Sequence, residues 1–181
     1  MVMGWNLLKF DLLGNLKMIR NFFGKLTLVS LLLVMTIVST SSVFAEQKYV
    51  NTTIVEGDFK ELLEAAQEAI KGRGMNVAHT LSASGMLKRT KGSFGIKDDV
   101  FLNAETIEFC NAKISHELAI GNPENIVLCP FAISVYVLSS DPKHVRLSFR
   151  EPFVMDDEIS KKATADMVSL VKSIINEAAE W

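Results

Sequence analysis

The chain has 181 residues, two cysteines and a formal net charge of −2 at pH 7. Its first 45 residues hold four basic residues and one acidic residue, so the 136 residues that follow carry a net charge of −5. This acidic balance argues against nucleic acid and anionic membrane surfaces as partners. A chain of this length can bury one hydrophobic core, so we expect a single folded domain.

Residues 1–45 have the pattern of an export signal. Lys17, Arg20 and Lys25 precede an apolar run over residues 26–38, and a short polar stretch leads to Ala45. This order of charged, apolar and small residues is typical of a cleaved signal peptide. A transmembrane anchor is the alternative, but it needs roughly 20 apolar residues. We predict cleavage after Ala45 and export, to the periplasm or beyond it, leaving one domain over residues 46–181 without membrane contact. Met18 is an alternative start.

The first half of the remaining chain predicts a strand, a helix and a second strand. Residues 49–55 are rich in β-branched side chains, which favour a strand. Asp58 then begins a predicted helix in which apolar side chains recur every three or four residues, until glycines 72 and 74 end it. Residues 75–81 alternate between apolar and polar side chains, so we expect a half-buried strand with His79 on its apolar side.

Residues 82–99 form the longest predicted connection, with one helical turn expected near its start. Connections of this length in a compact domain are usually functional or disordered. Lys88, Arg89 and Lys91 lie beside flexible glycines, a combination that suits a small anion such as phosphate or carboxylate. A solvated basic loop explains the same residues equally simply.

The centre of the chain predicts two strands joined by a short helix. Residues 100–110 form the first of these strands, and Asn111 can cap a helix over residues 112–120. Residues 126–138 form the next strand, which carries apolar side chains on both faces. Such a strand is either central in its sheet or has an outer face that meets a partner subunit.

The end of the chain predicts one more strand and a long helix. Val145, Leu147 and Phe149 alternate with polar residues in the fifth strand, and Asp156 or Asp157 caps the last helix. Strands and helices do not alternate regularly along the chain. We therefore predict an α+β fold, a two-layer sandwich in which helices cover one face of a largely antiparallel sheet.

Four segments resemble the domain of unknown function 302 family, and its exported branch in particular. They are MLKRT at 86–90, EFCNAKIS at 108–115, NPENIVLCPF at 122–131 and ISVYV at 133–137. The resemblance covers residues 52–152. It departs from many members at Ala112, where they have proline, and at Gly121 or Asn122, where they have an acidic residue. It implies a β-α-β4-α sandwich of the TATA-binding-protein-like class, often dimeric, and it implies no activity.

Cys110 and Cys129 are predicted to become neighbours at one edge of the sheet, if their strands pair antiparallel. A cysteine pair outside the cytoplasm is usually oxidised, and a disulfide here would close a loop of about 20 residues and contribute roughly 3 kcal/mol. Two alternatives remain open: two unpaired buried cysteines, or thiolates that serve redox chemistry or hold a metal or haem. The compact Cys-x-x-Cys spacing of redox dithiols does not occur in the sequence.

The histidines are weak candidates for metal ligands or catalytic bases. His116 points away from the apolar face of its helix, so we expect it at the surface. His79 is predicted to be either a core histidine with its hydrogen bonds satisfied or a ligand. His144 lies in a predicted turn, exposed to solvent. Zinc usually takes four ligands, whereas Cys110, Cys129 and one histidine make three.

No stretch of the sequence names a reaction. It contains no Gly-x-Ser-x-Gly elbow and no Gly-Lys-Ser/Thr phosphate loop. We therefore expect an exported, non-catalytic binding or assembly module that forms a homodimer and needs no cofactor, with a ligand that the sequence does not identify. One alternative is a periplasmic thiol-redox, metal or haem accessory protein that uses Cys110 and Cys129. The other is an enzyme or binder for a small anion that uses residues 82–99, with His79.

Overall fold

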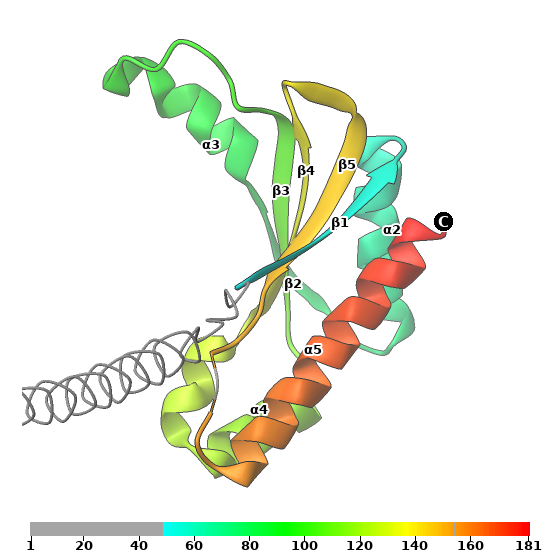
Figure 1. Ribbon diagram of the computed structural model, residues 1–181, viewed down its shortest axis with the longest axis vertical. Coiled ribbons are helices and arrows are strands. Elements are labelled where there is room, and N and C mark those ends of the chain that lie inside the picture. Colours follow the sequence, from blue (N-terminus) through cyan, green and yellow to red (C-terminus); the bar gives the residue numbers. More distant parts are fainter. Residues whose placement is uncertain (1–48, 154) are drawn as a thin grey trace, which may run out of the picture. The chain divides into compact units, whose positions relative to one another are not determined.

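The computed structural model describes residues 49–153 and 155–181 (Figure 1). These residues belong to one compact unit, Gln47–Trp181. The predicted signal peptide lies outside the described residues, and its cleavage and export stay predictions. In the described part of the chain, no helix combines the length and the apolar character needed to cross a bilayer.

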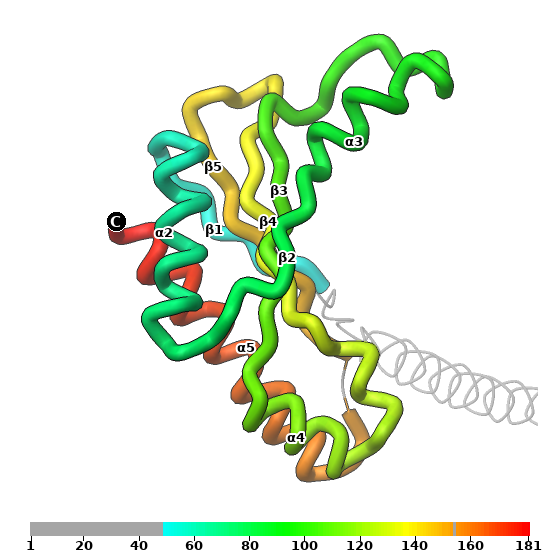
Figure 2. Tube along the Cα trace, turned by 180° about the vertical axis from the view of Figure 1, so that it is seen from behind, coloured from blue at the N-terminus to red at the C-terminus, as the bar shows by residue number. Residues whose placement is uncertain are grey.

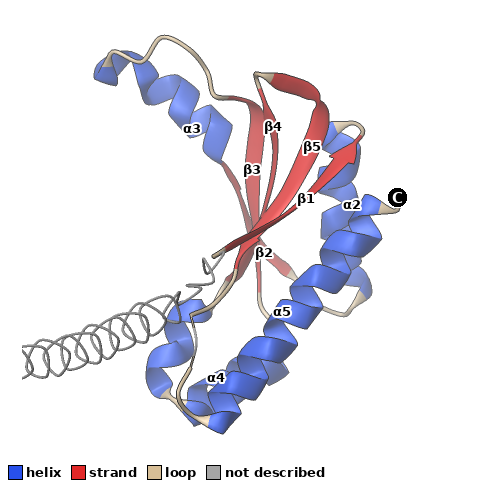
Figure 3. Cartoon of the chain, in the orientation of Figure 1, coloured by secondary structure: helices blue, strands red, loops and turns tan. Residues whose placement is uncertain are grey.

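Five strands form one antiparallel sheet in the order β1-β5-β4-β3-β2. The strands are β1 (Val50–Glu56), β2 (Val77–Ser82), β3 (Phe101–Phe109), β4 (Phe131–Leu138) and β5 (Asp141–Arg150). Two helices, α2 (Phe59–Gly72) and α5 (Glu158–Ala179), cover one face of this sheet (Figure 3). The predicted α+β sandwich with an antiparallel sheet is thus confirmed. We call the face turned away from α2 and α5 the open face.

Side-chain caps begin the helices where the sequence predicts them. Asp58 accepts hydrogen bonds from the backbone N–H groups of Lys60 and Glu61, at 2.8 and 3.1 Å, and so begins α2. Asp157 rather than Asp156 caps α5, because its carboxylate accepts the N–H of Ser160 at 2.7 Å. Each cap satisfies backbone donors that the first helical turn leaves without a partner.

The core lies between the sheet and the two helices. Alternate residues of β4 and β5 are buried there and pack against the apolar faces of α2 and α5. The most deeply buried large side chains include Ile70, Ile107, Phe109, Ile133, Leu147 and Ile174. α4 (Ala112–Gly121) packs against α5 beyond the end of the sheet, and the 3-10 helix η3 (Pro123–Leu128) follows it.

The fourth strand begins later than the sequence predicts. β4 starts at Phe131, and most of the preceding predicted strand is η3 instead. Asn122 caps η3 by accepting the Glu124 N–H at 3.0 Å, and Pro123 supplies the backbone angle of a first helical position. The apolar alternation therefore predicted a strand at residues where the Asn122 cap and Pro123 instead begin a 3-10 helix. The prediction that β4 is central holds, because β3 and β5 flank it.

The predicted position of His79 is wrong. The register between β2 and β3 shifts between Val77, which lies opposite Phe109, and His79, which lies opposite Glu108. A bulge adds one residue to a strand and so moves every later side chain to the other face. His79 is consequently exposed on the open face, whereas Val77 packs on the core.

The long connection is helical over more than the predicted turn. It contains α3 (Ala83–Thr90) and the 3-10 helix η2 (Lys91–Phe94), and Gly95 ends η2 in a left-handed conformation with φ of 69°. We call residues 83–100 the arm. The arm projects from the sheet on the side away from α2 and α5, as seen from both directions (Figures 1 and 2).

Candidate functional site

The two cysteines meet at the end of the sheet where β4 begins. Cys110 directly follows β3, and Cys129 ends η3 two residues before β4. Phe109 pairs with Phe131 across the two antiparallel strands, which brings the flanking residues together. The two Sγ atoms lie 3.1 Å apart, longer than the about 2.05 Å of a disulfide bond, and both residues are free thiols.

The backbone on both sides of the thiol pair is well anchored. Asn111 caps α4 by accepting the Ile114 N–H at 3.1 Å, and its amide donates to Met75 Sδ at 3.6 Å. The N–H of Cys129 donates to Ile126 O at 3.0 Å. Ser115 Oγ lies 3.2 Å from Cys129 Sγ. Three elements therefore converge on the two sulfurs: β3, α4 and η3.

The surroundings of Cys110 disfavour its thiolate. Desolvation first, and then the hydrogen bond with the Cys129 thiol, raises the pKa of Cys110 from 9.0 to about 11. The negative charge of Glu108 acts in the same direction. Cys110 is nevertheless solvent-exposed as a residue, whereas Cys129 is half-buried. At neutral pH the Cys110 thiol is thus accessible but protonated, unlike the low-pKa cysteines of nucleophilic enzymes.

The histidines do not join the thiols. Nowhere in residues 49–153 and 155–181 do three His, Cys, Asp or Glu side chains gather where they could hold a metal ion. His116 is exposed on α4, as its helical position predicts. His144 is half-buried within β5 rather than free in a turn, because its Nδ1 lies 2.7 Å from Asp141 Oδ1.

Asp141, the first residue of β5, binds two side chains farther along the same strand. Its carboxylate accepts hydrogen bonds from His144 and, at 2.6 Å, from Arg146. These bonds lower the pKa of Asp141, with the His144 contact as the larger cause. The Arg146 guanidinium is thereby bound to Asp141 at the start of β5.

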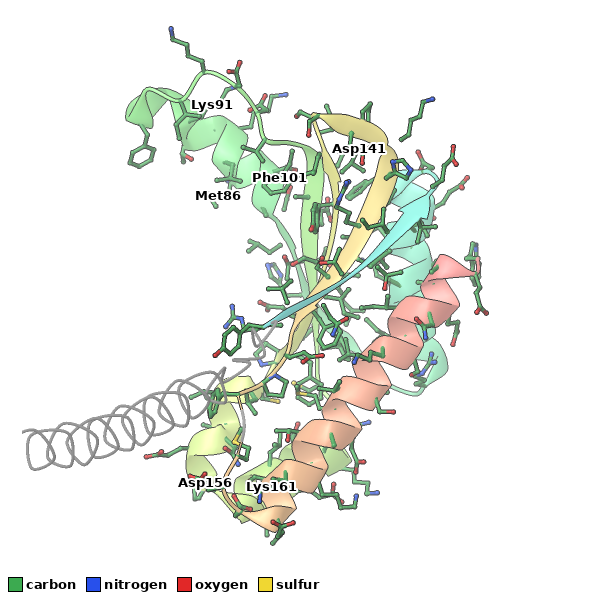
Figure 4. The ribbon with its side chains drawn as sticks, in the orientation of Figure 1. Met86, Lys91, Phe101, Asp141, Asp156 and Lys161 are labelled. Atoms are coloured by element: carbon green, nitrogen blue, oxygen red, sulfur yellow. The ribbon has the colours of Figure 1, made fainter. Side chains whose placement is uncertain are left out.

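The three basic residues of the predicted anion site differ in their surroundings. Lys88 and Arg89 are exposed on α3. Lys91, near the outer end of the arm in Figure 4, forms an ion pair with Asp99 at 2.8 Å and donates to Lys97 O at 3.2 Å. Its positive charge is thus neutralised within the arm, which weakens the predicted small-anion site.

A row of hydroxyl groups crosses the open face, and our sequence analysis missed it. Thr52 lies opposite Ser148, Ser148 opposite Ser134, and Ser134 opposite Thr106. The outer pairs are hydrogen-bonded, at 2.8 Å for Thr52 with Ser148 and 2.9 Å for Thr106 with Ser134. Ser or Thr alternates with apolar residues along these strands in the sequence. Only the register of the strands shows that these hydroxyl groups lie side by side.

A cavity of about 630 Å³ lies along this row, and Thr106, Ser134 and Ser148 line it. Its polar lining also includes Arg150 and Glu151, and its apolar lining includes Phe153. Leu128 and Pro130, the residues on either side of Cys129, also line it. The thiol pair therefore adjoins the wall of the cavity. Pockets with an apolar lining and a few polar groups are the usual form of a small-molecule site.

The arm has an apolar surface that its own chain leaves uncovered. Neither α3 nor η2 contains a buried residue. Phe94 is 76% exposed and Val100 65%, and Met86, labelled on α3 in Figure 4, is 42% exposed. Met86, Leu87, Phe94 and Ile96 also line a smaller cavity of about 250 Å³ within the arm.

Comparisons with known proteins identify a family and a fold. The family model described as domain of unknown function DUF302 matches residues 51–180. The crystal structure of an uncharacterised conserved DUF302 protein from Bacillus stearothermophilus is similar, with a TM-score of 0.60 and 18% sequence identity. The alignment covers 72% of this chain and 98% of that one. At this identity the likeness concerns the fold. A search of curated proteins finds no match.

Proposed function

The chain belongs to the DUF302 family, a domain of unknown function, and we propose that it is an exported, non-catalytic binding or assembly module that works as a homodimer. The observation that carries the proposal is the arm, a helical projection without a single buried residue in α3 or η2. A surface of this kind requires a partner.

The arm is too short to be stable by itself. α3 has eight residues, whereas isolated helices shorter than about 12–15 residues are marginal in water and depend on packing. Exposed apolar side chains also concentrate on the arm and just beside it: Leu81, Met86, Leu87, Phe94, Ile96, Val100 and Leu102. Contiguous exposed apolar surface marks interaction sites. We infer that another surface covers the arm in the working protein.

Charge supports a second copy of the chain as that surface. Residues 83–100 contain four basic and two acidic residues, a net charge of +2. The rest of residues 46–181 contains eleven basic and eighteen acidic residues, a net charge of −7. The arm of one copy is thus attracted to the body of another. The same acidic body gives no reason to propose nucleic acid or a membrane as partner.

The open face is the surface that we propose for the arm of the second copy. It carries exposed apolar side chains at Val50, Ile54 and Leu81. In a two-fold dimer each arm would cover the open face of the other copy, which gives two equivalent contacts. A stable interface buries about 800 Å² on each partner.

Light scattering of purified protein over a range of concentrations tests the proposal. We expect a dimer for the wild-type chain and a monomer for Phe94→Asp. Ile120→Asp is the matched control, because Ile120 is 70% exposed but lies on α4, at the other end of the domain. A wild-type monomer at high concentration, or equal effects of the two substitutions, would contradict the proposal. Cell fractionation tests export separately.

A second candidate function is a periplasmic thiol-redox, metal or haem accessory protein. The Sγ–Sγ distance of 3.1 Å favours a role for the thiol pair, and export would place it where cysteine pairs are usually oxidised to a disulfide. The metal and haem versions need further ligands, which neither His79 nor His116 supplies in this structure. Elemental analysis and a visible spectrum of the exported protein test them, with metal or a haem absorption band as the supporting result.

A further inference from the structure

We propose that Cys110 and Cys129 form a redox latch, a reversible disulfide that is closed by exchange with an external disulfide compound and that ties the wall of the adjoining cavity to β3. The latch rests on the proposed function in one respect, because export would place the protein in oxidising surroundings. Its chemistry and its position follow from the contacts around the two sulfurs.

The two thiols are already placed for bond formation. Their Sγ atoms need to approach by only about 1 Å to reach a disulfide bond length. The pairing of Phe109 with Phe131 holds both backbones, and the two rings contact edge to face with centroids 5.9 Å apart. Closing the bond therefore needs side-chain rotation rather than rearrangement of the strands.

Unequal exposure assigns different roles to the two sulfurs. Cys110 is exposed, so an external disulfide meets it first, whereas Cys129 is half-buried beside Ser115. The Cys110 thiol loses its proton and attacks one sulfur of the compound R–S–S–R, and the released R–S⁻ takes up a proton. The Cys129 thiolate then attacks the Cys110 sulfur and releases the second R–SH. Two protein thiols are oxidised and one external disulfide is reduced to two thiols.

The environment of Cys110 makes the latch slow to close at neutral pH. Because its pKa is raised to about 11, little thiolate is present at neutral pH and the first step accelerates as pH rises. To open the latch, an external thiolate attacks the exposed Cys110 sulfur, and Cys129 leaves and takes up a proton. A second external thiolate then attacks the mixed disulfide on Cys110, so that two external thiols become one disulfide and both protein thiols are restored.

The closed latch would act on the cavity of about 630 Å³. Cys129 lies between Leu128 and Pro130, which both line that cavity, and Ser115 connects it to α4. A disulfide to Cys110 would fix this wall to the end of β3. We expect the oxidised protein to melt about 10 °C above the reduced protein, as expected for a loop of this length in a domain of this size.

The test uses reduced, purified full-length protein mixed with glutathione disulfide at pH 8, followed by acid quenching, alkylation and mass spectrometry. We expect the wild-type chain to lose two hydrogens and to release two glutathione molecules per protein. Cys129→Ser should stop at one glutathione adduct on Cys110. Cys110→Ser should react much more slowly, because the remaining sulfur is half-buried.

Two results would overturn the latch. One is a wild-type chain that keeps two alkylatable thiols or accumulates a stable glutathione adduct. The other is equal adduct formation in Cys110→Ser and Cys129→Ser, which would remove the assigned roles. Light scattering on the same samples reports the dimer independently, so failure of the latch and failure of the proposed function are distinguishable.

Discussion

Asn125 is a buried polar side chain that joins three helical elements, and its removal should be costly. It is 4% exposed in η3, and its amide donates to Ser160 Oγ in α5 at 2.7 Å and to Leu118 O in α4 at 3.0 Å. Asn125→Ala removes both bonds. Leu118 O keeps the N–H of Asn122 at 3.1 Å, so Ser160 Oγ is the buried acceptor left without its donor. Each hydrogen bond contributes about 1 kcal/mol, and each buried group left unsatisfied costs roughly 1–3 kcal/mol. We expect a loss of about 3 kcal/mol in the free energy of unfolding.

Urea denaturation measures this loss. The midpoint should fall while the slope with denaturant stays constant, because the surface exposed on unfolding hardly changes. Asn176→Ala is the matched control, since Asn176 is exposed on α5 and its side chain makes no contact of this kind in the described residues. A loss below about 0.5 kcal/mol for Asn125→Ala, the usual range of neutral surface substitutions, would contradict the stabilising role of the two Asn125 hydrogen bonds.

Two further predictions concern the close packing of Gly121 against Ser160 and the protonation of Asp141. Gly121→Ala should destabilise the protein by about 2 kcal/mol, because the added Cβ would overlap Ser160 Oγ and lie 3.0 Å from the Ser160 nitrogen. Gly92→Ala, with no atom within 4 Å, should leave the melting temperature almost unchanged, and equal melting temperatures for the two variants would contradict this. Because His144 and Arg146 lower the pKa of Asp141, its stabilising effect should be complete above pH of about 4 and disappear as pH falls through the folded pKa. Wild-type and Asp141→Asn proteins should therefore differ in melting temperature at pH 7 and converge as pH falls through the folded pKa; a difference that grows in acid would be the contrary result.

Much of the fold could be predicted because local chemistry dictates it. Asp58, Asn111 and Asp157 each cap a helix through a side-chain oxygen within three residues, a relation that sequence spacing reveals. The alternation in β5 places Val145, Leu147 and Phe149 in the core as expected.

Two predictions are wrong, the face on which His79 lies and the residue at which β4 begins. In both places a local change of the backbone interrupts the apolar alternation. The bulge between Val77 and His79 moves His79 to the open face, and no sequence periodicity announces it. Pro123, with its capping asparagine, turns an apolar run into η3. In both cases the apolar pattern was interpreted as a regular strand, whereas the backbone has a bulge in one place and a 3-10 helix in the other.

The candidate site could be predicted only in part. Cys110 and Cys129 come together because a short helical connection joins antiparallel neighbours, which the sequence suggests. The hydroxyl row and the Lys91–Asp99 ion pair depend on register and on the fold of the arm. The helical arm itself was predicted mainly as a loop, because α3 is short and contains no buried residue that would give it a clear apolar face.

Photo-cross-linking shows whether the arm of one copy covers the open face of another. A photoactivatable phenylalanine analogue at position 94 is introduced into isotopically heavy protein, which is then mixed with light protein and irradiated. We expect cross-links between heavy arm peptides and light peptides from β1 or β2. Cross-links confined to peptides of the same copy, at concentrations where light scattering reports one species, would contradict it.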